Sequence, residues 1–327
     1  MHSTAYCQAV EQAAQITVPA RGRFIRTILL ELERVQSHLL WLGIAGHIIG
    51  FDTVLMQAWR IREPVMWLCE KITGNRKLLG MNLVGGVRRD IPQEVHGEIL
   101  EVLSRIEKET QKVLDAIVTD TTLFLRCENV GKISAADAVA LSLLGPTARA
   151  SGIGRDIRVD HPYAAYAEVG CQVIVETGED IWSRVVVRMK ETLEAIRIIR
   201  DCLSLLPKGP IIATIDQPIP AGRIGISSVE APRGETHHYV ITGEDNRPYR
   251  WKARAPTFQN LQGIPVMVQG QNIADVPIAL GSMDPCFSCT ERLETVDRLS
   301  GRVRIYTRQE LNALCKKRYS IDGSTHV

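Results

Sequence analysis

The chain has 327 residues, of which 45% are hydrophobic and 23% are charged, a composition typical of a globular protein with a large core. Its formal net charge of +2 gives no electrostatic reason to expect nucleic-acid binding. The most apolar run, residues 39–51, is interrupted by Gly43, Gly46 and His47 and is shorter than the roughly 20 residues that span a bilayer, so we expect no transmembrane helix.

Long helices are predicted through the first two thirds of the chain. Helically spaced apolar residues follow Pro19, a favourable first-turn residue. They are Ile25, Leu29, Leu32, Val35 and Leu39. A second helix is expected over residues 53–71, where Pro64 should kink or divide it. The same periodicity predicts a third helix starting near residue 92 and a fourth within residues 178–206.

The residue composition changes after the fourth predicted helix. Glycine, proline and β-branched residues dominate residues 209–249, a pattern that indicates short strands and turns. We found neither repeats nor low-complexity linkers that would separate two folding units. The predicted fold is therefore mainly α with a small β-rich insertion, a helical bundle in one domain.

Two cysteines near the end of the sequence, Cys286 and Cys289, are three positions apart, so both sulfurs can reach one metal ion. A tetrahedral zinc or four-thiolate centre needs two such pairs, which makes this pair half of a site. The remaining cysteines are isolated: Cys7, Cys69, Cys127, Cys171, Cys202 and Cys315. Since no basic region followed by an apolar stretch opens the chain, we expect reduced thiols or metal ligands and not disulfides.

Several motifs in a fixed order carry a resemblance to a known family. They are residues 2–6 (HSTAY), 18–21, 33–43, 85–88, 145–152, 160–163, 230–235 (EAPRGE) and 284–292 (DPCFSCTER). Over essentially its whole length the chain resembles the large catalytic subunit of membrane-bound, energy-converting NiFe hydrogenases of the formate-hydrogenlyase type. These are relatives of the 49 kDa subunit of complex I, the respiratory NADH-quinone oxidoreductase. The resemblance implies the same helical-bundle fold.

The resemblance also implies roles at a metal site. Cys286 would be a terminal ligand of nickel, and Cys289 would bridge nickel and iron. Arg233 would lie above the open side of the metal pair, where its guanidinium could orient Asp284 and assist proton movement. We assign Arg233 and Asp284 as the candidate catalytic residues on this basis.

Four further residues are candidates for cofactor binding. Pro232 precedes Arg233 in the Ala-Pro-Arg-Gly motif, and Arg254 and Thr257 resemble the segment around the diatomic ligands of iron. Tyr6 stands where the complex I relatives have a tyrosine at the quinone headgroup.

Each assignment has a simpler alternative. The cysteines would then be two buried thiols or half of a zinc site, and Arg233 would bond loop carbonyls. Thr257 would cap a turn, and Tyr6 would be a buried, hydrogen-bonded tyrosine. His2 shares the quinone-pocket interpretation with Tyr6. Histidines that could transfer protons are also open to a purely structural interpretation: His161, His237 and His238.

Two departures from the family pattern limit the carry-over. In the family a first C-x-x-C immediately precedes the HSTAY segment, whereas Met1 precedes it here. We therefore expect a C-terminal fragment that lacks a strand-rich region with an acidic residue, and a NiFe centre only if two further thiolates are supplied. Residues 1–292 would form the hydrogenase-like core. Residues 293–327 resemble the extension that a dedicated protease removes after nickel insertion.

Three functions remain open from the sequence. The leading one is the catalytic large subunit, or a fragment of it, of an energy-converting NiFe hydrogenase that reduces protons or oxidises hydrogen and is coupled to a membrane arm. The second is a complex I-like quinone-site subunit without a metal of its own, which the cysteine pair argues against. The third is a non-catalytic scaffold that docks an iron–sulfur subunit.

Every reading implies partners. The resemblance places a small subunit with an iron–sulfur cluster against this core, together with membrane-arm subunits, on the cytoplasmic side of the cell membrane. No G-x-G-x-x-G fingerprint is present in the sequence, so NAD binding is not supported by a motif in this chain.

Overall fold

The computed structural model describes residues 1–215 and 218–290, and after them residues 295–296, 301, 303–304, 306–307, 309–310 and 312–313. The chain consists of two compact units, Met1–Cys286 and Phe287–Val327. In the second unit the described elements are a 3-10 turn, η5 (Phe287–Cys289), and two antiparallel strands, β6 (Thr295–Val296) and β7 (Val303–Arg304). Most of the predicted C-terminal extension, residues 293–327, and Cys315 lie outside the described residues.

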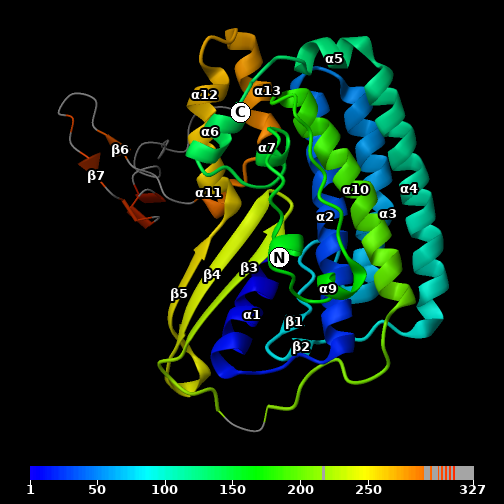
Figure 1. The fold of residues 1–327 in the computed structure, drawn as a ribbon, viewed down its shortest axis with the longest axis vertical. Coiled ribbons are helices and arrows are strands. Elements are labelled where there is room, and N and C mark those ends of the chain that lie inside the picture. Colours follow the sequence, from blue (N-terminus) through cyan, green and yellow to red (C-terminus); the bar gives the residue numbers. More distant parts are fainter. Residues whose placement is uncertain are drawn as a thin grey trace, which may run out of the picture. The chain divides into compact units, whose positions relative to one another are not determined.

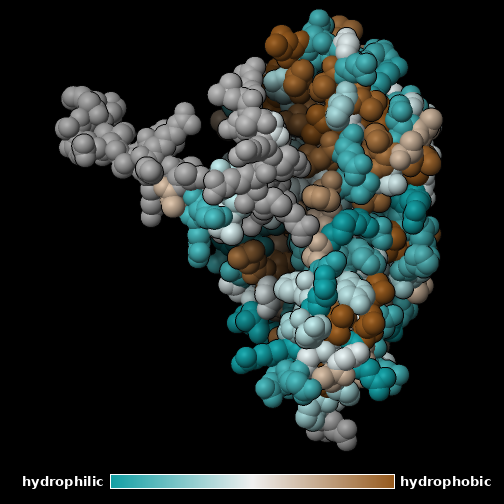
Figure 2. Space-filling model, turned by 90° about the vertical axis from the view of Figure 1, so that its left-hand side faces the viewer, coloured by the Kyte–Doolittle hydropathy of each residue, from teal (hydrophilic) through white to brown (hydrophobic). Residues whose placement is uncertain are grey.

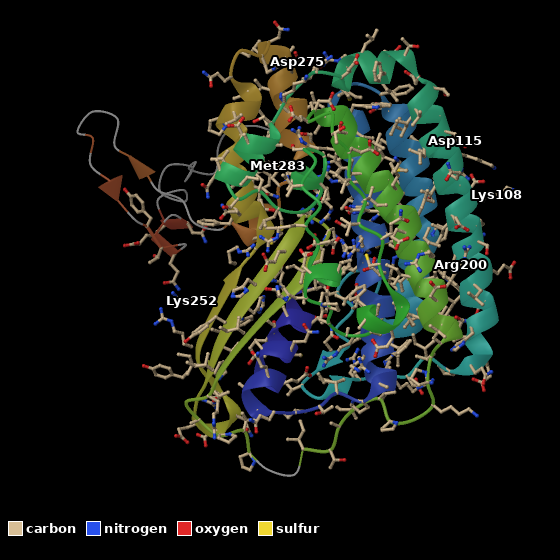
Figure 3. All side chains as sticks on the ribbon, in the orientation of Figure 1. Lys108, Asp115, Arg200, Lys252, Asp275 and Met283 are labelled. Carbon is tan, nitrogen blue, oxygen red and sulfur yellow. The ribbon has the colours of Figure 1, made fainter. Side chains whose placement is uncertain are left out.

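Four long helices pack side by side in the first unit (Figure 1). They are α2 (Ala20–Ile48), α3 (Asp52–Thr73), α4 (His96–Thr119) and α10 (Ile181–Ser204). The apolar face predicted for α2 is fully buried at Ile25, Leu32 and Leu39. Figure 3 shows Lys108 and Asp115 pointing away from the bundle on α4, as expected of an amphipathic outer helix. The mainly helical fold predicted from periodicity is confirmed.

Helix α3 runs through Pro64 without being divided, contrary to one of the two outcomes expected for this proline. Proline lacks the N–H that would bond four residues back, but this removes a single rung of the helix. Ile61, Val65 and Leu68 on either side of it are buried in the core. Packing of these residues holds the two halves as one helix, which ends at Gly74 in the left-handed conformation.

A three-stranded antiparallel sheet forms the β-rich part (Figure 1). Its strands, in order across the sheet, are β3 (Ile224–Ala231), β4 (Gly234–Thr242) and β5 (Pro248–Arg254). Helix α1 (His2–Ala14) packs on β3 and β4. The approach is so close that a Cβ on Gly225 would lie 1.8 Å from the carbonyl oxygen of Ala9, so glycine is required there. The predicted β-rich segment is confirmed and extends to Arg254.

Short elements connect these layers. The helices are α5 (Thr121–Cys127), α6 (Ala135–Ala140), α7 (Gly145–Arg149), α8 (Ile157–Asp160), α9 (Tyr166–Val169), α11 (Pro256–Asn260), α12 (Ile264–Val268) and α13 (Val276–Ser282). The 3-10 turns are η1 (Gln93–Val95), η2 (Glu244–Asn246), η3 (Leu261–Gly263) and η4 (Ile273–Asp275). A small hairpin joins β1 (Asn82–Leu83) to β2 (Gly86–Val87).

The surface is apolar in places. Figure 2 shows one face, on which hydrophobic side chains gather mainly toward the end that carries α12 and α13. Large apolar side chains that are exposed include those of Val139, Phe258 and Ile273. None of the helices that the structure describes has the length and apolar character needed to span a membrane.

Candidate functional site

The candidate site is built where the β3–β4 turn meets the end of α13. Arg233 lies in that turn, and its Nε donates a hydrogen bond of 2.6 Å to the carbonyl oxygen of Asp284. Its Nη2 donates a second bond of 2.8 Å to Asp284 Oδ1. Asp284 has a positive φ of 58°, a conformation that aspartate tolerates better than most residues. The planar guanidinium therefore ties two distant segments together through one residue.

Asp284 is a buried carboxyl group with spare bonding capacity. It is 7% exposed, and its Oδ2 has no hydrogen-bond partner among the described residues. Burial raises the pKa of Asp284, and the nearby thiol of Cys286 acts in the same direction. Arg233 and Arg188 oppose this rise in pKa. A carboxylate held in this way can accept one further hydrogen bond from a ligand or a water molecule.

Cys286 and Thr257 lie together beside this pair. The backbone N–H of Cys286 donates to Thr257 Oγ1 over 3.2 Å. Thr257 is buried in the first turn of α11. His2, on α1, is close enough for the charge of Cys286 to act on it, although burial lowers the pKa of His2 overall. The structure thus brings Arg233, Asp284, Thr257 and Cys286 to one place, whereas Cys289 belongs to the second unit.

The other three candidates have different surroundings. Arg254 is bound to the neighbouring strand, since its Nη1 donates to the carbonyl oxygen of Glu235 over 2.7 Å and its Nη2 to Glu235 Oε2 over 3.0 Å. The Tyr6 ring packs on Trp251, with ring centroids 4.7 Å apart. Pro232 occupies the β3–β4 turn next to Arg233.

The described residues do not form a metal centre by themselves. No group of three or more histidine, cysteine, aspartate or glutamate side chains is placed to hold a metal ion in the part of the chain that the structure describes. Around Arg233 the soft donor is the thiol of Cys286, and no disulfide joins any of the seven described cysteines. A NiFe centre thus does not fit the described residues of this chain without further thiolates.

A buried ion cluster lies behind the site and was not anticipated from the sequence. Its members are hydrogen-bonded or ion-paired to one another: Glu31, Arg34, His38, Arg149, Asp156, Arg158, Glu191 and Glu230. Arg149 is its hub, donating to Glu191 Oε1 over 2.8 Å and to Glu230 Oε1 over 2.9 Å. The sequence did contain an indication of this cluster. Glu31, Arg34 and His38 are spaced so that they share one face of the otherwise apolar helix α2.

Arg188 links this ion cluster to the candidate site. It is fully buried on α10, and its guanidinium lies 4.1 Å from the ring centroid of Trp41. Burial lowers the pKa of Arg188 to about 10, against the attraction of Asp284 and Glu191. Its Nε and Nη2 have no hydrogen-bond partner among the described residues. Unpaired donors on Arg188 and the unpaired oxygen of Asp284 mark a polar, incompletely satisfied region.

Comparison with known proteins gives consistent relatives. The family model described as "Respiratory-chain NADH dehydrogenase, 49 Kd subunit" matches residues 49–223 and 215–292. Formate hydrogenlyase subunit 5 of Escherichia coli (strain K12) is 39% identical over 321 residues, which are 98% of this chain and 55% of that protein. Hydrogenase-4 component G of the same organism is 36% identical over 98% of this chain and 54% of its own length.

A solved structure agrees with these matches. A chain in the structure of the membrane-bound sulfane sulfur reductase, described as an archaeal respiratory membrane complex, superposes with a TM-score of 0.81 at 29% identity. The match covers 86% of this chain and 78% of that chain. By contrast, this chain spans about half the length of the two Escherichia coli relatives.

Proposed function

The chain belongs to the family of the 49 kDa subunit of respiratory-chain NADH dehydrogenase, and we propose that it is the catalytic large subunit, or part of one, of an energy-converting NiFe hydrogenase. The reaction would be the reversible reduction of protons to hydrogen, coupled to a membrane arm. One observation carries this proposal: Cys286 lies beside the Arg233–Asp284 pair, with Thr257 bound to its backbone. Thiols of this kind suit nickel and iron.

The proposal requires ligands from outside the described residues. Cys286 and Cys289 would contribute two thiolates, and two more would have to come from elsewhere, because no third donor joins them among the described residues. Arg233 and Asp284 would act beside the metal, and Pro232 would shape the turn that presents Arg233. The anchoring of Arg233 at two atoms fixes its remaining N–H groups in direction, which is the kind of preorganisation that catalytic sites need.

Partners and location are part of the same proposal. We infer a small iron–sulfur subunit and membrane-arm subunits as partners, with the chain peripheral to the cytoplasmic side of the membrane. The hydrophobic side chains that gather on the face shown in Figure 2 support a protein partner, since exposed apolar patches mark interaction surfaces. The names of two relatives, formate hydrogenlyase subunit 5 and hydrogenase-4 component G, support the assignment to a complex, because each describes one part of a larger assembly.

A quinone-site subunit without its own metal is the second candidate. It is favoured by the description of the matching family. Tyr6, its candidate quinone-binding residue, lies against Trp251 and lines a cavity of only about 20 Å³. That volume is far below the roughly 300 Å³ of common ligand pockets. The thiol of Cys286 beside Arg233 has no role in a quinone site, so we rank this function second.

The hydrogenase proposal can be tested by hydrogen evolution in the complex purified from its native host. Cys286→Ser should abolish activity, because serine does not replace a thiolate on nickel. Cys171→Ser is the matched control, since Cys171 is also partly buried but has no place at the site, and it should keep most of the activity. An intact complex that evolves no hydrogen in its wild-type form would reject the proposal. Quinone reduction in its place would support the second candidate.

A further inference from the structure

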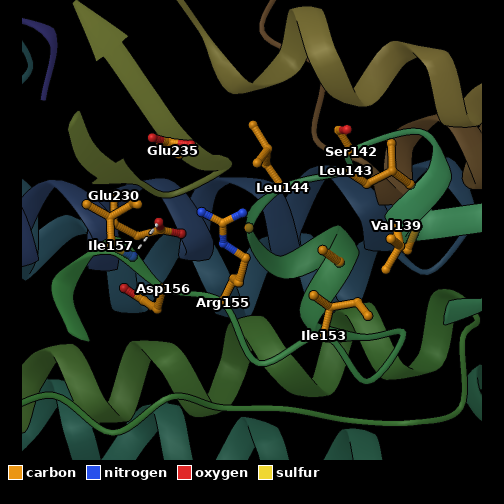
Figure 4. A pocket seen from close by; sticks show the side chains of 13 residues that line it. Val139, Ser142, Leu143, Leu144, Ile153, Arg155, Asp156, Ile157, Glu230 and Glu235 are labelled. Carbon is orange, nitrogen blue, oxygen red and sulfur yellow. Dashed lines mark hydrogen bonds between the residues drawn. The ribbon is translucent and has the colours of Figure 1, made fainter. Parts of the chain in front are cut away.

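A pocket of about 180 Å³ opens beside the β3–β4 hairpin, and none of the residues assigned to the metal lines it (Figure 4). Most of its wall is apolar, with Val139, Leu144 and Ile153 among the lining residues. Two carboxylates lie at one end, Glu230 and Asp156, and Figure 4 shows them close to Ile157. The volume is enough for several water molecules, and the carboxylates give water the polar partners that it needs.

Glu230 forms the junction between this pocket and the buried ion cluster. It is 2% exposed and lies on β3. Its Oε1 accepts a hydrogen bond from Arg149 Nη1 over 2.9 Å, and its Oε2 accepts one of 3.3 Å from the backbone N–H of Ile157. The carboxyl group therefore touches the cluster on one side and faces the pocket on the other.

Charged groups face Glu230 from each element packed around it. Helix α2 contributes Arg34, whose Nη2 donates to the carbonyl oxygen of Glu230 over 2.7 Å. Helix α7 contributes Arg149, and the segment at the start of α8 contributes Asp156 and Arg158. Arg155, just before them in the sequence, lines the same pocket as Glu230 (Figure 4). On the neighbouring strand β4, Glu235 is the register partner of Glu230. The hydroxyl of Tyr163 accepts a bond from the backbone N–H of Glu230.

The ion cluster contains more carboxylates than cations. Its carboxylates are Glu31, Asp156, Glu191 and Glu230, and its arginines are Arg34, Arg149 and Arg158. Burial lowers the pKa of His38 to about 4, so this histidine is neutral at pH 7 and adds no positive charge. Arg188 is the buried cation next to the cluster, but its attraction is divided between Glu191 and Asp284. The excess negative charge within the cluster is costly to bury, and binding one proton removes it.

Glu230 is the member of the ion cluster placed to bind that proton. Burial and the charge of Asp156 raise the pKa of Glu230 to about 7. For Asp156, burial is outweighed by Arg158 and Arg149, which lower its pKa to about 2. Arg149 and His38 likewise lower the pKa of Glu191 against the effect of burial. The other carboxylates therefore stay ionised at neutral pH.

We propose that Glu230 is a proton-exchange site that is filled and emptied through this pocket. A hydronium ion in the pocket gives its proton to a carboxylate oxygen of Glu230; one O–H bond breaks in hydronium, one forms on Glu230, and water is left. No electron moves in this step, and the net charge of the cluster rises by one. The cluster continues through Arg149 to Glu191, and the charges of Arg149 and Glu191 act on Arg188, which Asp284 also attracts, so this change of charge reaches the candidate site through Arg188.

Infrared difference spectra of the assembled complex, recorded between pH 5 and pH 9, test the proposal. A neutral carboxylic acid has a carbonyl band of its own, and we expect such a band to vanish as pH rises, with a midpoint near 7. Glu230→Gln should remove this band. Glu235→Gln is the matched control, because Glu235 lines the same pocket but is paired with Arg254, and it should leave the band in place. A titrating band that persists in Glu230→Gln would overturn the proposal, as would its absence from the wild type.

A second variant keeps the test decisive if Glu230→Gln does not assemble. Val139 is 63% exposed and lines the pocket, so Val139→Trp should obstruct the pocket without disturbing the core. The band should remain in this variant, and its shift on transfer to deuterated water should become several-fold slower. An unchanged exchange rate would show that protons do not travel through the pocket. The inference does not depend on the metal, because the band should titrate whether or not the complex contains nickel.

Discussion

The buried ion cluster and the candidate site use the same residue types but differ in how completely their carboxylate oxygens are paired. In the cluster each carboxylate contacts an arginine, and Arg149 alone bonds two of them. At the site a carboxylate oxygen, Asp284 Oδ2, and two donors of Arg188 have no partner among the described residues. In the cluster the atoms without a partner among the described residues are nitrogens, Arg149 Nη2 and His38 Nδ1. Paired charges fix the positions of helices, whereas unpaired polar atoms are available to a ligand. We therefore expect the cluster to stabilise the fold and the candidate site to bind a ligand.

Of the variants considered, Arg149→Met should have the largest effect on the free energy of unfolding. The change leaves Glu191 and Glu230 buried without their main cation, and breaking a buried ion pair costs about 3–5 kcal/mol. Chemical denaturation should show this loss in the free energy of unfolding. Arg155→Met is the control, because Arg155 is exposed and its nearest carboxylate is 3.8 Å away; it should change stability by less than about 0.5 kcal/mol. If both variants lowered the free energy of unfolding by the same amount, the cluster would not have the stabilising role assigned to it.

Arg233→Lys should separate activity from stability. Lysine keeps the charge but loses the two parallel bonds to Asp284, so hydrogen evolution should fall by about 10²-fold or more. The unfolding free energy should change little, since Arg233 is only partly buried. Arg250→Lys, on the exposed face of β5, should be silent in both assays. A stability loss as large as that of Arg149→Met would make Arg233 a structural residue.

The pH dependence of the unfolding free energy should show that His38 is neutral in the folded chain. Burial lowers its pKa to about 4 in the folded chain, against 6.5 when unfolded. The folded state therefore resists protonation, and the stability due to neutral His38 is complete above pH 6.5 and is lost as pH falls toward 4. At about 1.4 kcal/mol per pKa unit, the loss is about 3–4 kcal/mol.

His38→Gln should flatten this pH profile relative to the wild type in thermal unfolding. His47→Gln is the control, because His47 is largely exposed. The groups facing His38 are Glu191, Arg34 and Arg188, and the first of these could keep His38 charged if its attraction exceeded the cost of burial. A profile that is steep in both variants would indicate that His38 is already protonated at neutral pH.

The smallest effect should come from Tyr6→Phe. Its ring contact with Trp251 survives the change, so hydrogen evolution should stay within about twofold if Tyr6 is structural. Tyr249→Phe, at a site that is 79% exposed, gives the matched comparison. Loss of quinone reduction in Tyr6→Phe alone would favour the quinone-site function over the hydrogenase.

Helical periodicity was sufficient to predict α2, α4 and α10, because their apolar faces are continuous in sequence. The site motif also led to Arg233, Asp284 and Cys286, which the structure brings together. Those placements came from resemblance, since no local rule brings the β3–β4 turn to the end of α13.

Other features depend on tertiary structure and could not be read from the sequence. The partner of Arg254 proved to be Glu235, a pairing set by the register of β4 and β5. The ion cluster joins α2, α7 and α10 with β3, and its members are up to 199 positions apart, from Glu31 to Glu230. Charged residues on apolar helix faces indicated that partners must exist, but not which ones.

The most direct test of the account is the nickel and iron content per chain, measured by elemental mass spectrometry on the complex purified from its native host. We expect close to one nickel per chain, with iron beyond that of the iron–sulfur clusters, and loss of the nickel in Cys286→Ser but not in Cys171→Ser. An intact, fully assembled complex without nickel would contradict the hydrogenase assignment. It would leave a quinone-site subunit or a docking scaffold as the function of this fold.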